Sequence, residues 1–388
     1  GAMASAKLAI AAAVAAVAAA SAVAAVFGVD AIGACSNLLA NANLRRQASG
    51  AVGDVPATMT AVVAVDSTCV TKPWPVPRAL AEEDVLIRVV ATAINRLDTM
   101  QRRGKSPVPR GVTEVLGLEV AGVVVALGAA ARGFHVGDRV MALVPGGGYA
   151  EYVSVHTATV MHKPRALSWA QAATVPEAWL TAALNLQLGH AAAGETVLIH
   201  AAASGVGVAA IQLARAAGLR VLVTVGSAEK LALATKLGAA GGAIRHDGPW
   251  LETVRALAPK GVDLILDCVA GSYAEQNLES LAVDGRWVLY SLLGGPALPP
   301  TLAPTFMAQL LRKRVQLIAT TLRTRPTPFK RALVQDFAAR ALPRLGGDLT
   351  IVIDREFDGL EQAQAAHEYM ESNANLGKIV LHVLKTVL

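Results

Sequence analysis

The stretch that decides the fold is 196-TVLIHAAASGVGVAAIQLARAAGLRVLVTV-225. It begins with a short apolar strand at 196–200, passes through a turn of small residues, and enters a helix at about 205–217. Gly218 can end that helix, and a second apolar strand follows at 221–225. Strand, small-residue turn, helix and strand in this order form the unit from which parallel α/β sheets are built.

The same alternation continues along the chain. A helix is predicted around 229–237, a strand at 264–267, a helix around 274–281 and a strand at 286–290, and a helical segment at 168–190 precedes the first strand. Strands that alternate with helices indicate a parallel sheet with helices on both faces. We therefore expect a doubly wound, Rossmann-type α/β domain.

The residues before this region follow a different pattern. Short apolar segments separated by Gly and Pro lie at 60–65, 85–90, 120–125 and 139–143. Strands at such short spacing predict a small β-rich, barrel-like unit between Met59 and about Pro164. The tail mixes helices with two more predicted strands, 350–353 and 379–383.

The composition excludes several classes of protein. The 388 residues are 54% hydrophobic and 16% charged, so the chain is too apolar for a disordered protein. Its three cysteines are too few and too widely separated for a disulfide framework or a zinc ribbon. The 35 basic residues exceed the 29 acidic ones only slightly, which fits an anionic small ligand at least as well as a nucleic acid.

The N-terminal residues form a separate segment. From Leu8 to Val29 the sequence carries no charge and consists mostly of Ala and Val. Three interpretations stay open: a targeting segment headed by Lys7, a weak membrane anchor, or an Ala-rich surface helix. The stretch 41–58 has the Gly, Pro and Arg content of a linker, so the folded body is expected to begin near Met59. The cellular compartment is left open.

The turn 200–207 predicts a binding site for a dinucleotide. Small side chains let a backbone approach a pyrophosphate closely, and the N-terminus of the following helix offers free N–H groups. In place of the three glycines of a G-x-G-x-x-G fingerprint the chain has Ala202, Ser204 and Gly207. The alternative is that these small residues serve only the tight packing of strand and helix.

The end of the next strand bears on which cofactor is bound. NAD sites usually place an Asp or Glu there for the ribose hydroxyls, but this strand ends Val225-Gly226-Ser227-Ala228. Ser227 and Lys230 can bind a 2′-phosphate, which a carboxylate would repel. We therefore expect NADPH rather than NADH. The alternative is that Lys230 is only a solvated helix residue.

Other polar residues receive structural interpretations. His200 at the end of a buried strand is expected to be a hydrogen-bond partner rather than a catalyst, and Cys268 a buried apolar side chain. The basic runs at 102–103 and 312–314 are expected on exposed faces. They lack the interleaved aromatic residues of a platform for nucleic acid.

Taken together, the motifs resemble the medium-chain dehydrogenase/reductase superfamily, and within it the zinc-free NADPH:quinone oxidoreductase branch related to zeta-crystallin. The resemblance runs from about Met59 to Leu384. It rests on Asn95-Arg96 with Met100-Gln101-Arg102, Leu116-Gly-Leu-Glu119-Val-Ala-Gly122, Gly137-Asp138, Pro145-Gly-Gly-Gly148, Pro176-Glu177-Ala-Trp179-Leu-Thr181, Ser204-Gly-Val-Gly207, Asp284-Gly-Arg-Trp-Val-Leu-Tyr290 and Gly377-Lys-Ile-Val380.

The resemblance implies two domains after the N-terminal segment 1–58. A GroES-like β-barrel domain for the substrate is built from residues 59–178 and 321–388, and a Rossmann domain for NADPH from residues 179–320. Where the zinc-dependent branch carries a Cys and a Gly-His-Glu motif, this chain has Asn95 and Gly117-Leu118-Glu119. The thiolate and imidazole that tetrahedral zinc needs are missing, so no metal is expected.

The resemblance also implies roles for single residues. Asn95, Ser106 and Ser204 are the expected catalytic positions, although relatives commonly have a Tyr where Ser106 stands, so the substrate pocket is expected to be reshaped. Arg245 stands where relatives have Tyr or His near the 2′-phosphate, and a guanidinium there would strengthen the preference for NADPH. The expected cofactor contacts are Ser204, Gly205, Val206, Gly207, Gly226, Ser227, Lys230, Arg245, Cys268, Val269, Ser291, Leu292, Leu293, Gly294, Thr320, Thr321 and Leu322.

The implied activity is NADPH-dependent reduction of a quinone by hydride transfer without metal or flavin. Two alternatives are kept: reduction of an activated double bond in an enone, alkenal or enoyl thioester, and a catalytically idle NADPH-binding protein of the crystallin type. A homodimer is expected through the strand 286–290, taken as a sheet edge that its own copy would cover. Nucleic acid is not an expected partner, and a membrane is expected only through the N-terminal segment.

Overall fold

The computed structural model describes residues 55–384. The expected targeting segment or anchor, with almost all of its linker, lies outside the described residues. The folded body is one compact unit, Pro56–Leu384, and its first strand begins at Thr58, close to the expected start at Met59. Within the described residues, no helix has both the length and the apolar character needed to cross a bilayer.

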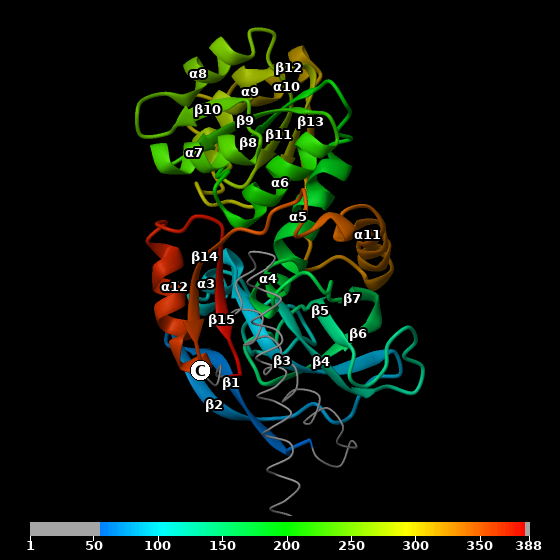
Figure 1. Ribbon diagram of the computed structural model, residues 1–388. Coiled ribbons are helices and arrows are strands. Elements are labelled where there is room, and N and C mark those ends of the chain that lie inside the picture. The colour runs from blue at the N-terminus through cyan, green and yellow to red at the C-terminus, as the bar shows by residue number, and fades with distance from the viewer. Residues whose placement is uncertain (1–54, 385–388) are drawn as a thin grey trace, which may run out of the picture. The chain divides into compact units, whose positions relative to one another are not determined.

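Six parallel strands form the expected doubly wound sheet (Figure 1). The side chains of its central strands are mostly apolar and buried, because helices cover both faces there and keep them from water. The strand order is β10-β9-β8-β11-β12-β13, with β8 Thr196–Ile199, β9 Arg220–Val225, β10 Gly241–Ile244, β11 Val262–Asp267, β12 Leu281–Leu289 and β13 Gln316–Ala319. The helices of this region are α6 Gly205–Ala216, α7 Ala228–Leu237, α8 Trp250–Leu257, α9 Ala274–Ser280 and α10 Phe306–Lys313.

A second, mostly antiparallel sheet draws on both ends of the body, as expected for the barrel-like domain. Ile379 near the C-terminus lies opposite Ile94 from the N-terminal half. The sheet order is β14-β15-β3-β4-β5-β7, and β6 pairs with β3. Its strands are β3 Asp84–Ile94, β4 Glu119–Leu127, β5 Arg139–Leu143, β6 Tyr152–His156, β7 Val160–His162, β14 Ile353–Asp358 and β15 Lys378–His382, and β1 Thr58–Val65 with β2 Thr68–Pro75 forms a separate hairpin. The residue boundaries between the two domains stay a prediction.

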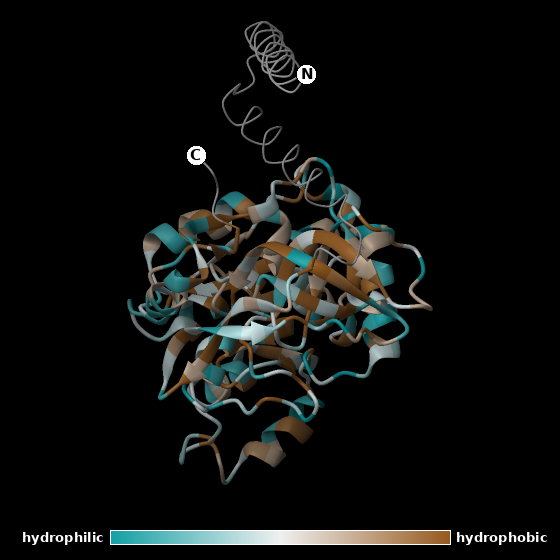
Figure 2. Cartoon of the chain, turned by 90° about the horizontal axis from the view of Figure 1, so that it is seen from below, coloured by the Kyte–Doolittle hydropathy of each residue, from teal (hydrophilic) through white to brown (hydrophobic). Residues whose placement is uncertain are grey.

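The remaining helices connect or flank the two sheets. The segment expected to be helical at 168–190 is two helices, because Pro176 cannot continue a helix and instead occupies the first turn of the second one. These helices are α3 Arg96–Arg102, α4 Trp169–Ala173, α5 Pro176–Leu188, α11 Thr327–Arg340 and α12 Ala363–Glu371, with short 3-10 turns at Thr157–Thr159, Gly271–Tyr273, Leu342–Arg344 and Leu360–Gln362. Figure 2 shows hydrophobic residues along the central strands and hydrophilic ones mainly in outer segments.

Two expectations from the sequence are wrong. The strand expected at 350–353 lies instead at Ile353–Asp358. The side chain of Gln212 accepts a hydrogen bond from the Thr350 N–H and donates one to the Thr350 carbonyl oxygen, so these backbone groups are not available for pairing with a strand. The segment 286–290, expected at the sheet edge, belongs to β12, which pairs with β11 on one side and β13 on the other. The edge of the sheet is therefore β13.

Candidate functional site

A cavity of about 420 Å³ lies where the carboxyl ends of the parallel strands face the second sheet. One side is formed by the β8–α6 turn and by the ends of β9 and β11. The other side is formed by Asn95 and Arg96 at the start of α3 and by Gly377 and Lys378 at the start of β15. Ligands of open parallel sheets bind at this edge, so the cavity is the candidate active site.

The turn between β8 and α6 brings the backbone close to the cavity. The Ser204 Oγ accepts a hydrogen bond from the Gly207 N–H at 3.1 Å and caps α6. A Cβ on Gly207 would lie 2.5 Å from the carbonyl oxygen of Ala202, so a larger residue does not fit. Gly205 and Val206 line the cavity in the first turn of α6, where N–H groups have no helical acceptor and can bind an anion.

The cavity brings together most of the residues expected from the sequence. Of the three expected catalytic positions, Asn95 and Ser204 line it, whereas Ser106 lies in the loop after α3 and is not among its lining residues. The expected cofactor residues that line it are Ser204, Gly205, Val206, Gly226, Lys230, Arg245, Cys268, Val269, Ser291, Leu293 and Gly294. Gly207, Ser227, Leu292, Thr320, Thr321 and Leu322 are not among its lining residues. The roles assigned to all these residues stay predictions.

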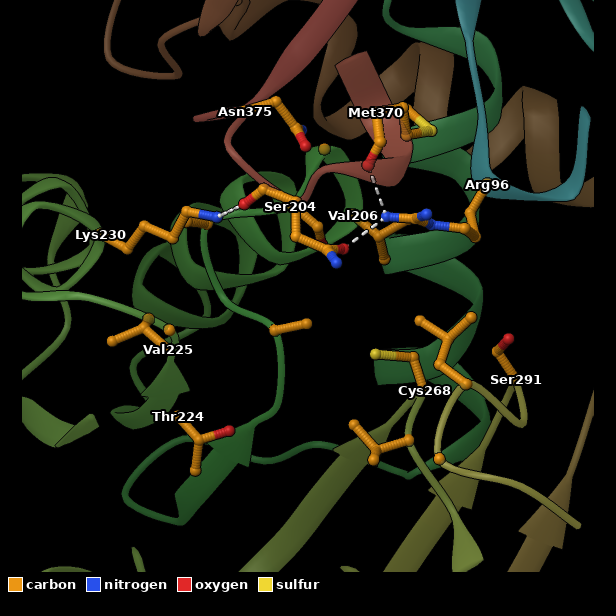
Figure 3. A pocket seen from close by; sticks show the side chains of 18 of the residues that line it. Arg96, Ser204, Val206, Thr224, Val225, Lys230, Cys268, Ser291, Met370 and Asn375 are labelled. Carbon is orange, nitrogen blue, oxygen red and sulfur yellow. Dashed lines mark hydrogen bonds between the residues drawn. The ribbon is translucent and has the colours of Figure 1, made fainter. Parts of the chain in front are cut away.

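Four cationic side chains line the same cavity: Lys230, Arg245, Arg96 and Lys378. The Lys230 Nζ donates to the Asn373 carbonyl oxygen at 2.5 Å, and the Arg96 Nη2 donates to the Asn373 Oδ1 at 2.7 Å (Figure 3). Burial lowers the pKa of Lys230, and the nearby charge of Arg245 lowers it further. Lys230 and Arg96 share the uncharged oxygen acceptors of Asn373, so both keep the positive charge that a phosphate would bind.

Sequence reasoning missed several cavity residues. Arg96 and Lys378 were part of the quoted motifs but received no role, and Thr224, Tyr273 and Asn373 gave no signal. Asn373 and Lys378 lie in or after the connection from α12 to β15, far along the chain from the turn that they face. A spacing pattern cannot detect residues that meet only through tertiary contacts.

A buried ion pair lies beside Asn95, at the place where the zinc-dependent relatives carry metal ligands. The Lys378 Nζ donates to the Glu119 Oε1 at 2.7 Å, to the Asn95 Oδ1 at 2.8 Å and to the Ile94 carbonyl oxygen at 3.0 Å. The Asn95 Nδ2 donates to the same Glu119 oxygen at 2.9 Å. The amide of Asn95 is therefore held in one orientation by a cation on one side and a carboxylate on the other.

Further acids lie close to this ion pair. Burial raises the pKa of Asp98 to about 7, although its carboxylate accepts hydrogen bonds from the Asn95 N–H and the Tyr149 hydroxyl. The Glu177 N–H donates to the Glu119 Oε2 at 2.8 Å, and burial together with Glu119 raises the pKa of Glu177 to about 8. At neutral pH Glu177 therefore carries its proton.

Replacing Glu177 by Gln is expected to flatten the dependence of stability on pH. The carboxyl has a reference pKa of 4.5 and a folded value of about 8, so its contribution to stability is complete below pH 4.5 and is lost as the pH rises to about 8. Gln mimics the protonated acid and does not titrate. Urea unfolding at pH 5 and pH 8 should show a loss of stability that is smaller in the variant by about 3 kcal/mol. The matched control is Glu229→Gln on the exposed face of α7, and equal slopes in both variants would contradict the assignment.

Two side chains near the cavity have the environments expected of them. His200 is completely buried and bonds the Thr224 Oγ1 at 2.8 Å and the Asn277 Oδ1 at 2.7 Å, which confirms a hydrogen-bonding role. Cys268 is also buried, as expected, and burial raises the pKa of its thiol to about 12. Within residues 55–384, no group of three or more His, Cys, Asp and Glu side chains is arranged to hold a metal ion.

The residues of the cavity fit a nicotinamide dinucleotide. The Gly207 position leaves no room for a Cβ, the first turn of α6 can bind a pyrophosphate, and cations stand beside the end of β9. Among the described residues that line the cavity there is no Asp or Glu to repel an additional phosphate. Lys230 and Arg245 are the residues that would hold such a phosphate.

Two family models match the chain, one in each of the two sheet regions that border the cavity. The model described as "Alcohol dehydrogenase GroES-like domain" matches residues 81–165. The model described as "Zinc-binding dehydrogenase" matches residues 205–339, which begin at α6. The first match covers strands of the second sheet, and the second covers most of the parallel sheet.

The chain is also similar to individual proteins and to solved structures. The chain is 32% identical over 312 residues to a quinone oxidoreductase from Sus scrofa, which covers 79% of this chain and 90% of that protein. It is 36% identical over 223 residues to a squalestatin tetraketide synthase from Cochliobolus lunatus, covering 55% of this chain and 8% of that protein. A solved quinone oxidoreductase from Thermus thermophilus, also determined as its complex with NADPH, matches with a TM-score of 0.69 and 34% identity, covering 84% of this chain and 100% of that one.

Proposed function

This chain belongs to the medium-chain dehydrogenase/reductase superfamily, in its quinone oxidoreductase branch, and on that premise we propose that it reduces quinones with NADPH, without metal or flavin. The family implies an oxidoreductase with a nicotinamide cofactor. The choice of NADPH is supported by Lys230 and Arg245, which line the cavity beside Gly226. It is supported further by the relative from Thermus thermophilus, which was solved with NADPH.

The reaction that we propose is a direct hydride transfer. Bound NADPH would supply the hydride, and a quinone is electron-poor enough to accept it without a Lewis acid, giving a hydroquinone anion that takes its proton from water. The chain contributes position: the first turn of α6 binds the pyrophosphate, and Lys230 with Arg245 binds the 2′-phosphate. Val269 and Leu293 contribute apolar side chains to the lining of the cavity, and Asn95 is held in place by its bonds to Lys378 and Glu119.

The cofactor is tested by titrating the protein with NADPH and NADH. The wild type is expected to bind NADPH at least tenfold more tightly. Lys230→Ala and Arg245→Ala should each weaken NADPH binding about tenfold, because a hydrogen bond to a charged group is lost, and leave NADH binding nearly unchanged. Lys236→Ala, on the exposed side of the same helix α7, is the control. Equal affinity of the wild type for the two cofactors would refute the assignment.

The substrate is tested by following NADPH consumption with three classes of compound. Turnover of ortho- and para-quinones that survives treatment with a chelator supports the proposal. Turnover only with enones, alkenals or enoyl thioesters would identify a double-bond reductase instead. Saturable NADPH binding with no turnover would identify a catalytically idle protein, and activity lost on chelation and restored by zinc would overturn the metal-free mechanism.

A homodimer is proposed through the edge strand β13 rather than through the segment 286–290. Among the described strands, β13 pairs only with β12, and nearby apolar side chains are exposed: Met307 by 76%, Leu311 by 79% and Leu317 by 41%. A second copy would cover this edge. Light scattering at micromolar concentration should give twice the mass of the chain, and Leu311→Lys with Leu317→Lys should give a monomer. A wild-type monomer, or a double variant that dimerises as well as the control Val136→Lys, would contradict this interface.

A further inference from the structure

Behind the wall of the cavity lies a buried carboxylate that the proposed mechanism does not use. Asp267 is the last residue of β11 and is completely buried. Its Oδ1 accepts from the Val269 N–H at 2.6 Å and the Ala270 N–H at 3.1 Å. Its Oδ2 accepts from the Asn277 Nδ2 at 2.9 Å and the Trp287 Nε1 at 3.0 Å. All four recorded donors are neutral, so this carboxylate is held by hydrogen bonds alone.

The first two bonds hold a strained turn in place. Ala270 has a φ of +70° and a ψ of −123°, a combination that side chains disfavour and that glycine adopts freely. Such a conformation persists only where the surroundings enforce it. The two preceding residues, Cys268 and Val269, line the cavity. The Asp267 carboxylate thus enforces the backbone path of one cavity wall.

The other bonds lead along the same side of the cavity to the end of β9. The Asn277 Nδ2 donates to Asp267, so the Asn277 Oδ1 accepts from the His200 Nε2 at 2.7 Å. Burial lowers the pKa of His200, so the ring is neutral and its Nδ1 accepts from the Thr224 hydroxyl at 2.8 Å. Thr224 lies near the end of β9 and lines the cavity. One continuous series of hydrogen bonds therefore connects Asp267 with the wall at β9.

We propose that Asp267 is a positioning residue of the cofactor site, which sets the wall at Cys268 and Val269 directly and the wall at Thr224 through Asn277 and His200. The affinity for the cofactor then depends on Asp267, although this side chain is buried and does not line the cavity. The proposal rests on the proposed function only in that the cavity binds a nicotinamide cofactor. Asp267 positions parts of the cavity that NADPH and NADH would both contact, whereas Lys230 and Arg245 would contact the 2′-phosphate, which only NADPH carries.

The direct test is the dissociation constant of NADPH and of NADH for Asp267→Asn in the full chain. An amide oxygen cannot accept from all four donors, and the new NH2 group faces N–H groups that have no acceptor. Both cofactors should bind at least tenfold more weakly, by the same factor. The matched control is Asp263→Asn on the same strand. The Asp263 carboxylate accepts a hydrogen bond of 2.8 Å from the Thr196 N–H, and neither residue lines the cavity, so this variant should leave both dissociation constants unchanged.

A milder variant keeps the proposal testable if Asp267→Asn does not fold. Ala270→Gly removes the strain without removing a bond, so the melting temperature should rise by about 3 °C or more. Both cofactors should bind about threefold more weakly, because glycine widens the range of backbone conformations that the two Asp267 hydrogen bonds must restrain.

The outcomes separate this proposal from the proposed function. Unchanged cofactor binding in Asp267→Asn would overturn the positioning role, as would Ala270→Gly with unchanged melting temperature and affinity. A loss confined to NADPH would also overturn it, since a wall effect is common to both cofactors. A wild type that binds neither cofactor would instead refute the proposed function.

Discussion

Replacing Lys378 by Met is expected to destabilise the folded body by about 3–5 kcal/mol. The Lys378 Nζ lies 2.7 Å from the Glu119 Oε1, and the side chain of Glu119 is completely enclosed. Met fills most of the volume of Lys but leaves the carboxylate without a cation and the Asn95 Oδ1 without its donor. Urea or guanidinium unfolding of the two proteins measures the difference.

The control for this prediction is another lysine that makes three hydrogen bonds. The Lys313 Nζ donates to the carbonyl oxygens of Leu278, Glu279 and Leu281, with no carboxylate among these acceptors. Lys313→Met should therefore cost only about 1 kcal/mol. Adding Glu119→Gln to Lys378→Met should recover most of the loss, because the uncompensated charge is then absent. A Lys378→Met protein as stable as Lys313→Met would contradict the role of the ion pair.

Replacing Gly207 by Ala is expected to abolish cofactor binding and to destabilise the body by about 1–3 kcal/mol. The new Cβ would lie 2.5 Å from the carbonyl oxygen of Ala202 and 2.6 Å from its Cα, and neither backbone atom can turn aside as a side chain could. Helix α6 would have to move away from the turn that follows β8. Calorimetric titration with NADPH and thermal unfolding measure the two effects.

The control is a glycine where a Cβ meets no obstacle. Gly347 lies outside the cavity, and its Cβ would lie 3.4 Å from the Arg344 carbonyl oxygen, at the edge of ordinary contact. Gly347→Ala should bind NADPH as the wild type does. Gly207→Ala with retained affinity and stability would show that the turn can shift, and that the small residue there is not required.

The fold could be predicted largely from local patterns. The alternation around Gly207 identified the parallel sheet because each strand and helix of that region carries its own periodicity and turn residues. The strand at 286–290 was found, but its place inside the sheet was not. The reason is that β13, which pairs with it on the outer side, is only four residues long, too short for its apolar residues to indicate a strand. Whether a strand lies at the edge or in the centre of a sheet depends on the strands with which it pairs, and its amino-acid composition does not identify those strands.

The site could be predicted in part. Ser204 and Lys230 were expected at the cofactor site because the turn and the strand end have a recognisable order along the chain, and Arg245 because of the family resemblance. All three line the cavity. Lys378 and Asp267 were not assigned roles, because the role of a charged residue in an apolar strand depends on the side chains that it contacts, and the sequence does not identify them.

By itself the sequence determined that the protein has a parallel sheet and a turn of small residues before one of its helices, whereas the absence of a zinc site stays a prediction. Those features depend on residues that are neighbours in the chain. Only the tertiary structure decided that a lysine pairs with Glu119 beside Asn95 and that Asp267 supports two walls of the cavity. The physical reason is that a buried charge is stable only with partners, and the fold brings those partners from distant segments.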